Sequence, residues 1–202
     1  MPPTIIATVG GATSNSYETH SEANTYFGER LPLSPPWVTS GQEAALIMAT
    51  RVLDSMATPH RNLTYDRSCD CQFYVTSRQW TGTPASATQR LAWPRVGMFD
   101  RNGNAIPSNV IPRELKEAQS ELAGQLLVSD TTLDNPILVQ GITSVRAGSV
   151  SVSFKEAIAR HVLPDAVLNL MPPSWLTDET VTPARPAEFD VVSERPPILG
   201  VS

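Results

Sequence analysis

The most constraining feature of the chain is the stretch LAWPRVGMFDRNGNAIPSNVIP, which spans residues 91–112 and leads directly into RELKEAQSELAGQLL. It joins an aromatic–proline pair, Trp93-Pro94, to a turn rich in Asp, Asn and Gly at residues 100–104. Pro112 is then expected as the first residue of an amphipathic helix, because a proline loses no hydrogen bond at that position. The stretch holds no nucleophile motif, metal cluster or phosphate loop. Distinctive residues that serve shape rather than chemistry are typical of structural or interaction proteins.

Apolar periodicity predicts three main helices. The first is expected over residues 21–30, with Ser21 as its cap. A second helix follows Ser40, whose spacing from Glu43 is that of a capping box. The apolar stripe of the second helix is Leu46, Ala49, Leu53 and Met56, and that of the helix after Pro112 is Leu115, Ala118, Leu122 and Leu126.

The remaining elements are few, and together they predict a mainly α fold. Residues 138–154 form an expected β-hairpin, because valines alternate with serines over residues 149–154. A short strand is expected over residues 72–76, within an otherwise irregular region from 60 to 90. The predicted architecture is a small helical bundle with this hairpin and extended N- and C-terminal arms. Its parts are an extended segment over 1–18, a helical core over 19–155, and a C-terminal arm over 156–202.

The charge distribution favours protein partners over nucleic acid. The 202 residues carry a formal net charge of -5, yet residues 51–113 hold eight arginines against four acidic residues. Residues 114–202 hold twelve acidic residues against six basic ones. A basic middle beside acidic flanks fits packing against an acidic partner or another copy, whereas a DNA-binding protein usually shows a basic total. The thirteen arginines against two lysines also favour interfaces.

The sequence carries no signature of an enzyme or of a cofactor site. It has no G-x-S-x-G, no H-E-x-x-H and no G-K-[ST] after its glycines. The three histidines lack metal-ligand spacing. Cys69 and Cys71 are expected to be reduced thiols, because alternate residues of a strand point to opposite faces. We therefore expect no catalytic, cofactor or metal residues, and no membrane association, since no apolar run is long enough to span a bilayer.

The C-terminal region is expected to dock on other chains. Six of the 18 prolines fall within residues 172–202, so a long helix is excluded there. We predict an arm that leaves the core from about residue 171. Its expected partner-docking residues are Met171, Trp175, Leu176, Phe189, Ile198 and Leu199. Trp37 fits either a core anchor or a partner contact and is included with them, whereas Trp93 fits the core better.

Eight sequence pieces occur in a recognisable order along residues 12–155. They are Asn15-Ser16-Tyr17, SEANTYFGERL (21–31), Trp37, EAALIMATRVLD (43–54), Trp80-x-Gly82, QRLAWPRVGMFDRNG (89–103), IPRELKEAQSELA (111–123) and VRAGSVSVSF (145–154). This order resembles the tailed-bacteriophage head–tail connector proteins, also called adaptor or head-completion proteins. Many of their relatives carry the label DnaT-like single-stranded-DNA-binding protein. Residues 60–80 and the C-terminal arm depart from the usual form of the family.

The resemblance implies a structural virion protein. Several copies, with a dodecamer expected, would form a homo-oligomeric ring that connects the phage portal to the tail and completes the head after DNA packaging. Its partners would be other copies, the portal protein, and tail or nozzle/tail-terminator proteins. It would be made in the host cytoplasm and reside in the neck of the virion. Genomic DNA would pass through the lumen without specific binding, because a net acidic protein repels phosphate.

The alternative function is that of a single-stranded-DNA-binding phage replication protein, as the family label states. Such proteins combine a basic groove with aromatic side chains on which bases stack. The acidic total and the lack of a basic run interleaved with aromatic residues count against this alternative.

The two apolar stripes yield a direct stability prediction. Leu53→Ala and Leu122→Ala should each lower the free energy of unfolding by roughly 2–5 kcal/mol, because each deletes buried methylene groups and leaves a cavity. Denaturant melts of the purified variants measure this. A shift below about 0.5 kcal/mol, the range typical of surface substitutions, would show that the helix faces are misassigned.

Overall fold

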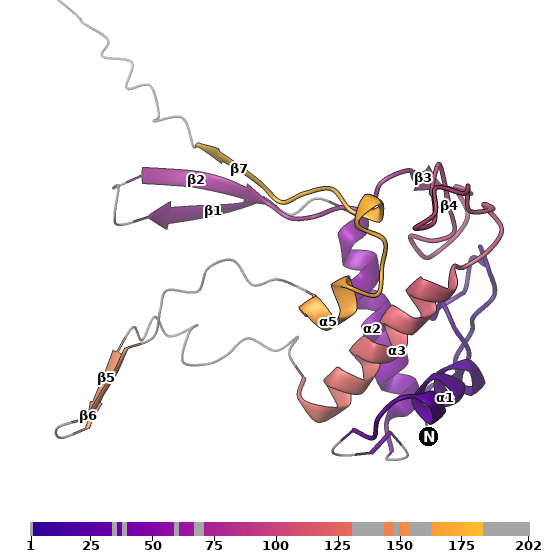
Figure 1. Cartoon of the computed structure of the whole chain (residues 1–202), viewed down its shortest axis with the longest axis horizontal. Coiled ribbons are helices and arrows are strands. Elements are labelled where there is room, and N and C mark those ends of the chain that lie inside the picture. The colour runs from indigo at the N-terminus through magenta and orange to yellow at the C-terminus, as the bar shows by residue number, and fades with distance from the viewer. Residues whose placement is uncertain are drawn as a thin grey trace, which may run out of the picture.

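Helices α2 (Gln42–Asp54) and α3 (Arg113–Val128) pack against each other at the centre of the structure (Figure 1). Both apolar stripes expected from the sequence are buried along this contact, and Leu46, Leu53 and Leu115 are fully inaccessible to solvent. Arg51 lies off the stripe of α2 and is exposed. Helical periodicity therefore located this part of the core correctly.

The computed structural model describes residues 2–33, 36–37, 40–58, 61–66, 71–130, 144–147, 150–153 and 163–183. The other elements in chain order are α1 (His20–Glu29), η1 (Ser55–Ala57), β1 (Arg61–Asp66), β2 (Cys71–Thr76), β3 (Thr83–Pro84), β4 (Arg95–Val96), β5 (Ser144–Ala147), β6 (Val150–Ser153), α5 (Asp165–Leu168), η2 (Pro173–Trp175) and β7 (Thr180–Pro183). Helices α1 and α5 both pack against α3.

Three small antiparallel sheets make the fold mixed α/β, so the expectation of a mainly α bundle is wrong. The expected hairpin is present where the structure describes it, as β5 paired with β6 from Ser144↔Ser153 to Ala147↔Val150. The expected strand over 72–76 is also present, as β2. Its two partners, β1 and β7, were not expected, because pairing between distant segments leaves no periodic signal in either segment alone.

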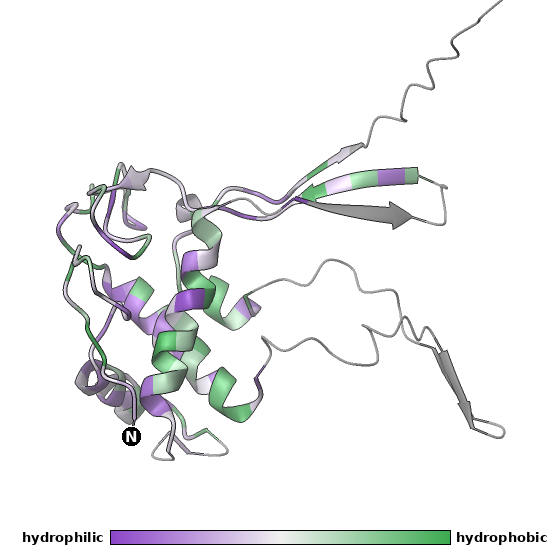
Figure 2. Ribbon diagram, turned by 180° about the vertical axis from the view of Figure 1, so that it is seen from behind, coloured by the Kyte–Doolittle hydropathy of each residue, from purple (hydrophilic) through white to green (hydrophobic). Residues whose placement is uncertain are grey.

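The three-stranded sheet, in the order β1-β2-β7, projects away from the helices (Figure 1). All its pairings are antiparallel, and Arg61, Thr76 and Thr180 share one row across the sheet. Hydrophobic and hydrophilic positions are mixed along β2, whereas hydrophobic residues are concentrated on the packed helices (Figure 2). Val75 is buried, while Val181 in β7 is 62% exposed. The sheet therefore shares little apolar surface with the core.

Three tryptophans from distant segments close the end of the core from which this sheet emerges. The ring centroids of Trp80 and Trp93 lie 5.6 Å apart in an edge-to-face arrangement, and those of Trp93 and Trp175 lie 4.8 Å apart. The indole N–H of Trp80 donates to the carbonyl oxygen of Leu53 at 2.9 Å, and that of Trp175 donates to the carbonyl oxygen of Phe99 at 2.7 Å. The indole N–H groups of Trp80 and Trp175 are thus buried and hydrogen-bonded, whereas the buried N–H of Trp93 has no hydrogen-bond partner among the described residues.

The predicted arm over 156–202 is corrected for the part that the structure describes: residues 163–176 pack on the core, and β7 (Thr180–Pro183) belongs to the projecting sheet. Met171 is 2% exposed and Trp175 is completely buried. Leu176 forms an isolated β-bridge with Trp80, just before β7 joins the sheet. The prediction considered only the local proline content, whereas η2 places Trp175 against tryptophans 82 and 95 residues earlier in the sequence.

Trp37 is also a core residue rather than an exposed partner contact. Its side chain is 6% exposed, and its ring stacks on Phe27 with 4.0 Å between centroids. Its indole N–H donates to Asn24 at 2.8 Å. The remaining predicted docking residues, Phe189, Ile198 and Leu199, lie outside the described residues.

The helix ends differ from the sequence expectations in detail. Thr19, not Ser21, caps α1 through a reciprocal capping box with Glu22. Gly41 precedes α2 in a left-handed conformation with φ 99°, so the expected capping box of Ser40 is absent. Pro112 is the cap of α3 rather than its first residue. Several residues near each helix start satisfied the same capping rule, and tertiary packing selected among them.

A buried arginine fixes the loops around the tryptophans. Arg95 is 5% exposed and donates to the carbonyl oxygens of Thr81 (2.7 Å), Gly82 (2.8 Å) and Ala92 (3.1 Å). Gly82 has φ +65°, and a Cβ there would lie 2.4 Å from the carbonyl oxygen of Val96. Arg95 therefore joins the segment at Thr81 and Gly82 to its own loop at Ala92. The close approach of Gly82 to Val96 leaves no room for a Cβ, so position 82 requires glycine.

Two truncations separate the core from the tail. Deleting residues 172–202 should unfold the protein or lower its melting temperature strongly, because it removes Trp175 and β7. Deleting 184–202 is the matched control and removes none of the described contacts. Trp175→Ala alone should lower the free energy of unfolding by about 3–5 kcal/mol. Thermal melts followed by circular dichroism measure all three, and equal melting temperatures for the two truncations would contradict this role of Trp175.

Candidate functional site

Ionic side chains line an open groove beside α2. Its volume is about 580 Å³, and Arg51, Arg90 and Asp54 are among the residues that line it. Both arginines are exposed, whereas Asp54 is half-buried. The two arginine side chains of the groove face solvent, whereas the Asp54 carboxylate is hydrogen-bonded to residues of the core.

Asp54 connects this groove to the core. It accepts hydrogen bonds from the hydroxyl of Tyr17 and from the backbone N–H of Ala92, the latter at 3.1 Å. Burial raises the pKa of Asp54, against the lowering effect of these hydrogen bonds. Burial and the neighbouring Asp54 also raise the pKa of Tyr17 well above its ordinary value. The Tyr17–Asp54 hydrogen bond therefore holds the N-terminal segment onto α2. Because Asp54 already accepts two hydrogen bonds, little of its carboxylate is left for a ligand.

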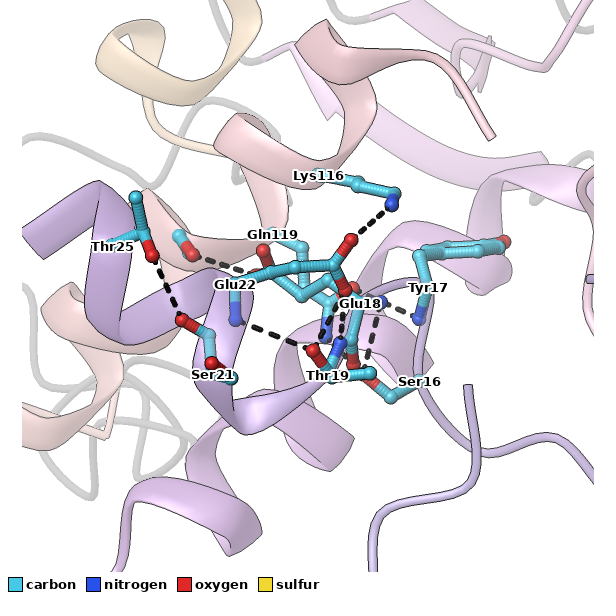
Figure 3. A network of polar contacts seen from close by, with 10 residues as sticks. Ser16, Tyr17, Glu18, Thr19, Ser21, Glu22, Thr25, Lys116 and Gln119 are labelled. Carbon is cyan, nitrogen blue, oxygen red and sulfur yellow. Dashed lines mark hydrogen bonds and ion pairs between the residues drawn. The ribbon is translucent and has the colours of Figure 1, made fainter. Parts of the chain in front are cut away.

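A buried polar network occupies the other side of this segment (Figure 3). The amide of Gln119 on α3 donates to the Ser16 hydroxyl at 2.7 Å and accepts from the backbone N–H of Tyr17 at 3.0 Å. The Ser120 hydroxyl donates to the Glu18 carboxyl at 2.6 Å. Glu18 is 2% exposed, and burial raises its pKa from 4.5 to about 8. These contacts position the chain that enters α1.

Ion pairs on α3 hold α1 in place from outside. Arg30 donates to both carboxylate oxygens of Glu121, at 2.6 and 2.8 Å, and the Tyr26 hydroxyl donates to the same group at 3.0 Å. The hydrogen bonds from Arg30 lower the pKa of Glu121. Lys116 forms an ion pair with Glu22 at 2.5 Å. Glu22 is also the partner of Thr19 in the capping box of α1. Bidentate geometry of this kind gives orientation as well as energy.

The projecting sheet presents a different kind of surface, made of strand edges. Strands β1 and β7 form its two edges, and each pairs with β2 alone among the described strands. At one edge, Arg61 is exposed with its guanidinium 3.9 Å from the centroid of the Tyr74 ring. At the other edge, Asp178 and Glu179 immediately precede β7. Unpaired N–H and C=O groups on such edges are templates for another strand.

No group of three or more His, Cys, Asp and Glu side chains is placed to hold a metal in the part of the chain that the structure describes. None of the described helices is both long and apolar enough to cross a bilayer. Cys71 is disulfide-bonded, so the expectation of reduced thiols is wrong. That expectation assumed that both cysteines share a strand, whereas β2 begins at Cys71.

Sequence reasoning missed the polar residues that organise the core. Gln119 lies four residues after Leu115 and three before Leu122, so it occupies the apolar face of α3, and this spacing was a usable signal. Arg95 directly follows the aromatic–proline pair, but nothing local marks it as buried. Glu18 gave no signal either, because its burial depends on packing against α3.

Part of the chain matches a known protein family. A family model described as "Putative DnaT-like ssDNA binding protein" matches residues 70–177. The match includes β2, the whole of α3 and all three clustered tryptophans, and it ends just after Trp175. No curated protein and no solved structure matches the chain.

Glu18 predicts a specific pH dependence of stability. Its carboxyl is protonated in the folded state up to a pKa of about 8, against an ordinary value of 4.5. The folded state therefore binds more protons in this window, and stability should fall as the pH rises from 4.5 to about 8. Glu18→Gln keeps the acceptor for Ser120 and should flatten this fall. Denaturant melts across the pH range test it, and identical pH profiles for both proteins would contradict the assignment.

Proposed function

We propose that this chain, which belongs to the DnaT-like ssDNA-binding protein family, is a ring-forming structural protein that connects the portal of a tailed phage to its tail. On this proposal the ring assembles in the host cytoplasm, completes the head after DNA packaging and resides in the neck of the virion. Its partners are other copies, the portal protein and tail proteins. DNA passes through the lumen without specific binding.

The single observation that carries this proposal is the projecting sheet. Small sheets need a covered hydrophobic face or further strands for independent stability. Here β1-β2-β7 stands away from the helices, with open edges and with Val181 62% exposed (Figure 1). Soluble monomers usually protect such edges. A neighbouring subunit would supply both the missing strand partner and the missing apolar cover.

The disposition of the arginines supports assembly over nucleic-acid binding. Of the described arginines between 51 and 113, three donate hydrogen bonds to oxygen atoms of the chain itself. Arg95 holds three carbonyl oxygens, Arg101 donates to Asn169 and Leu170 at 2.8 Å each, and Arg113 pairs with Glu117 at 2.6 Å. These residues form local contacts rather than a continuous basic track, which binding to a phosphate backbone requires.

Single-stranded-DNA binding is the second candidate, and the family description favours it directly. The groove with Arg51 and Arg90 is the surface that would carry it. Two cations beside an open hollow could contact successive phosphates, and the affinity would then fall steeply with salt. Among the described residues, no tryptophan, tyrosine or phenylalanine lines this groove, so the stacking platform of such proteins is lacking there.

One pair of measurements separates the two functions. The purified full chain, with portal protein added, should form closed rings in electron micrographs and co-sediment with the portal. A gel shift with oligothymidine at low salt should show no tight binding. Arg51→Glu/Arg90→Glu should leave ring formation intact. A monomeric protein that binds single strands, with affinity lost in this double variant, would overturn the connector and establish the second candidate.

A further inference from the structure

We propose that the outer edge of β7 in one copy pairs with the outer edge of β1 in the next copy, so that the projecting sheets join head to tail. This inference deepens the ring function proposed above and rests on it. It assigns the subunit interface to two specific strand edges of this chain.

The topology determines the geometry of such a joint. Both β1 and β7 are antiparallel to β2, so they run in the same direction, away from the helices (Figure 1). Copies placed side by side in equivalent orientation would therefore pair β7 with β1 in parallel. This contact uses two different surfaces and repeats from copy to copy, which is the condition for a closed ring. A joint between two β1 strands would instead be two-fold and would stop at a dimer.

The two edges carry opposite charges close to the same row of the sheet. Arg61 begins β1 and shares a row with Thr180, the first residue of β7. Asp178 and Glu179 lie directly before that row on the opposite edge. None of these three residues forms an ion pair with another described residue. The Arg61 guanidinium lies over the Tyr74 ring of the central strand β2, so it marks the face of the sheet that Arg61 shares with Thr180. Side chains alternate between faces along a strand, so Asp178 falls on this face and Glu179 on the other. Asp178 of a neighbouring copy is therefore the acidic residue that would meet Arg61.

The occupant of each edge is another copy rather than an unrelated protein, because one chain carries both halves of the joint. The four residues of β7 also fit within the six-residue length of β1. A different partner would need to match only one edge and would leave the other open. Val181, exposed on β7, would gain apolar cover from the neighbouring sheet.

A charge swap tests the pairing. Arg61→Glu and Asp178→Arg should each reduce the fraction of protein in rings about tenfold at fixed concentration, through repulsion in the joint. The double variant Arg61→Glu/Asp178→Arg should restore rings, because it exchanges the two charges. Arg113→Glu, an exposed arginine at the start of α3, is the matched control and should assemble normally. Circular dichroism of each variant checks that the monomer is folded.

Cysteine cross-linking distinguishes the possible joints. In a Cys69→Ser/Cys71→Ser background, Arg61→Cys/Thr180→Cys should give a ladder of cross-linked species beyond the dimer. The two positions are separated by β2 within one chain, two strand spacings of about 4.8 Å each, so a disulfide there must link different copies. Either single cysteine should give no links. A covalent dimer from Arg61→Cys alone would overturn the head-to-tail pairing.

The outcomes separate this inference from the proposed function. Three results support the edge pairing. The single charge variants lose rings, the double variant regains them, and the double-cysteine variant gives a ladder of cross-linked species. Wild-type ring yields from both single charge variants would overturn the pairing and leave the ring function standing. Loss in both single variants without rescue in the double variant would also overturn it. Absence of rings from the unmodified chain would overturn the proposed function and the pairing together.

Discussion

The packing of Trp80, Trp93 and Trp175 is the contact on which the rest of the structure depends. It joins the end of the β2 segment, the loop before α3 and the returning C-terminal chain at one point. Large aromatic rings contribute more buried area than any other side chains, and edge-to-face pairs add to that stabilisation. Helix α5 and Met171 also anchor the C-terminal segment on the core, but Trp175 is the last fully buried residue before β7 and fixes the route of the chain into the sheet.

The tryptophan cluster also fixes the base of the projecting sheet. The backbone N–H of Thr81 donates to Trp175 at 2.8 Å, and that of Thr177 donates to Gln79 at 2.8 Å. These bonds join the two chains that lead to β2 and β7 as they leave the core. The sheet is therefore held firmly at one end while its edges stay open. A rigid base with open edges suits an element that completes its pairing in a neighbouring subunit.

The buried polar groups have a different role, which is to define how the N-terminal segment docks. Gln119 contacts Ser16 (Figure 3). Glu18 contacts Ser120, and Asp54 contacts Tyr17. A buried polar group left without a partner is costly, so a network of this kind favours one arrangement over alternatives. These carboxyl groups are used internally, which leaves the exposed charges of the sheet edges and the groove as the groups available to partners.

The sequence by itself determined the elements whose signal is local. The stripes of α2 and α3 follow helical periodicity, and the β5–β6 hairpin follows alternation with serine, so all three were predicted. Only the tertiary structure decided the burial of Trp175 and Arg95 and the β1-β2-β7 pairing that makes the fold mixed α/β, because each depends on residues elsewhere in the chain. The cap of α1 at Thr19 is local instead, since its spacing to Glu22 is that of a capping box. A proline-rich segment has the same composition whether it is an arm or a core strand, and only the partner that buries its tryptophan distinguishes the two.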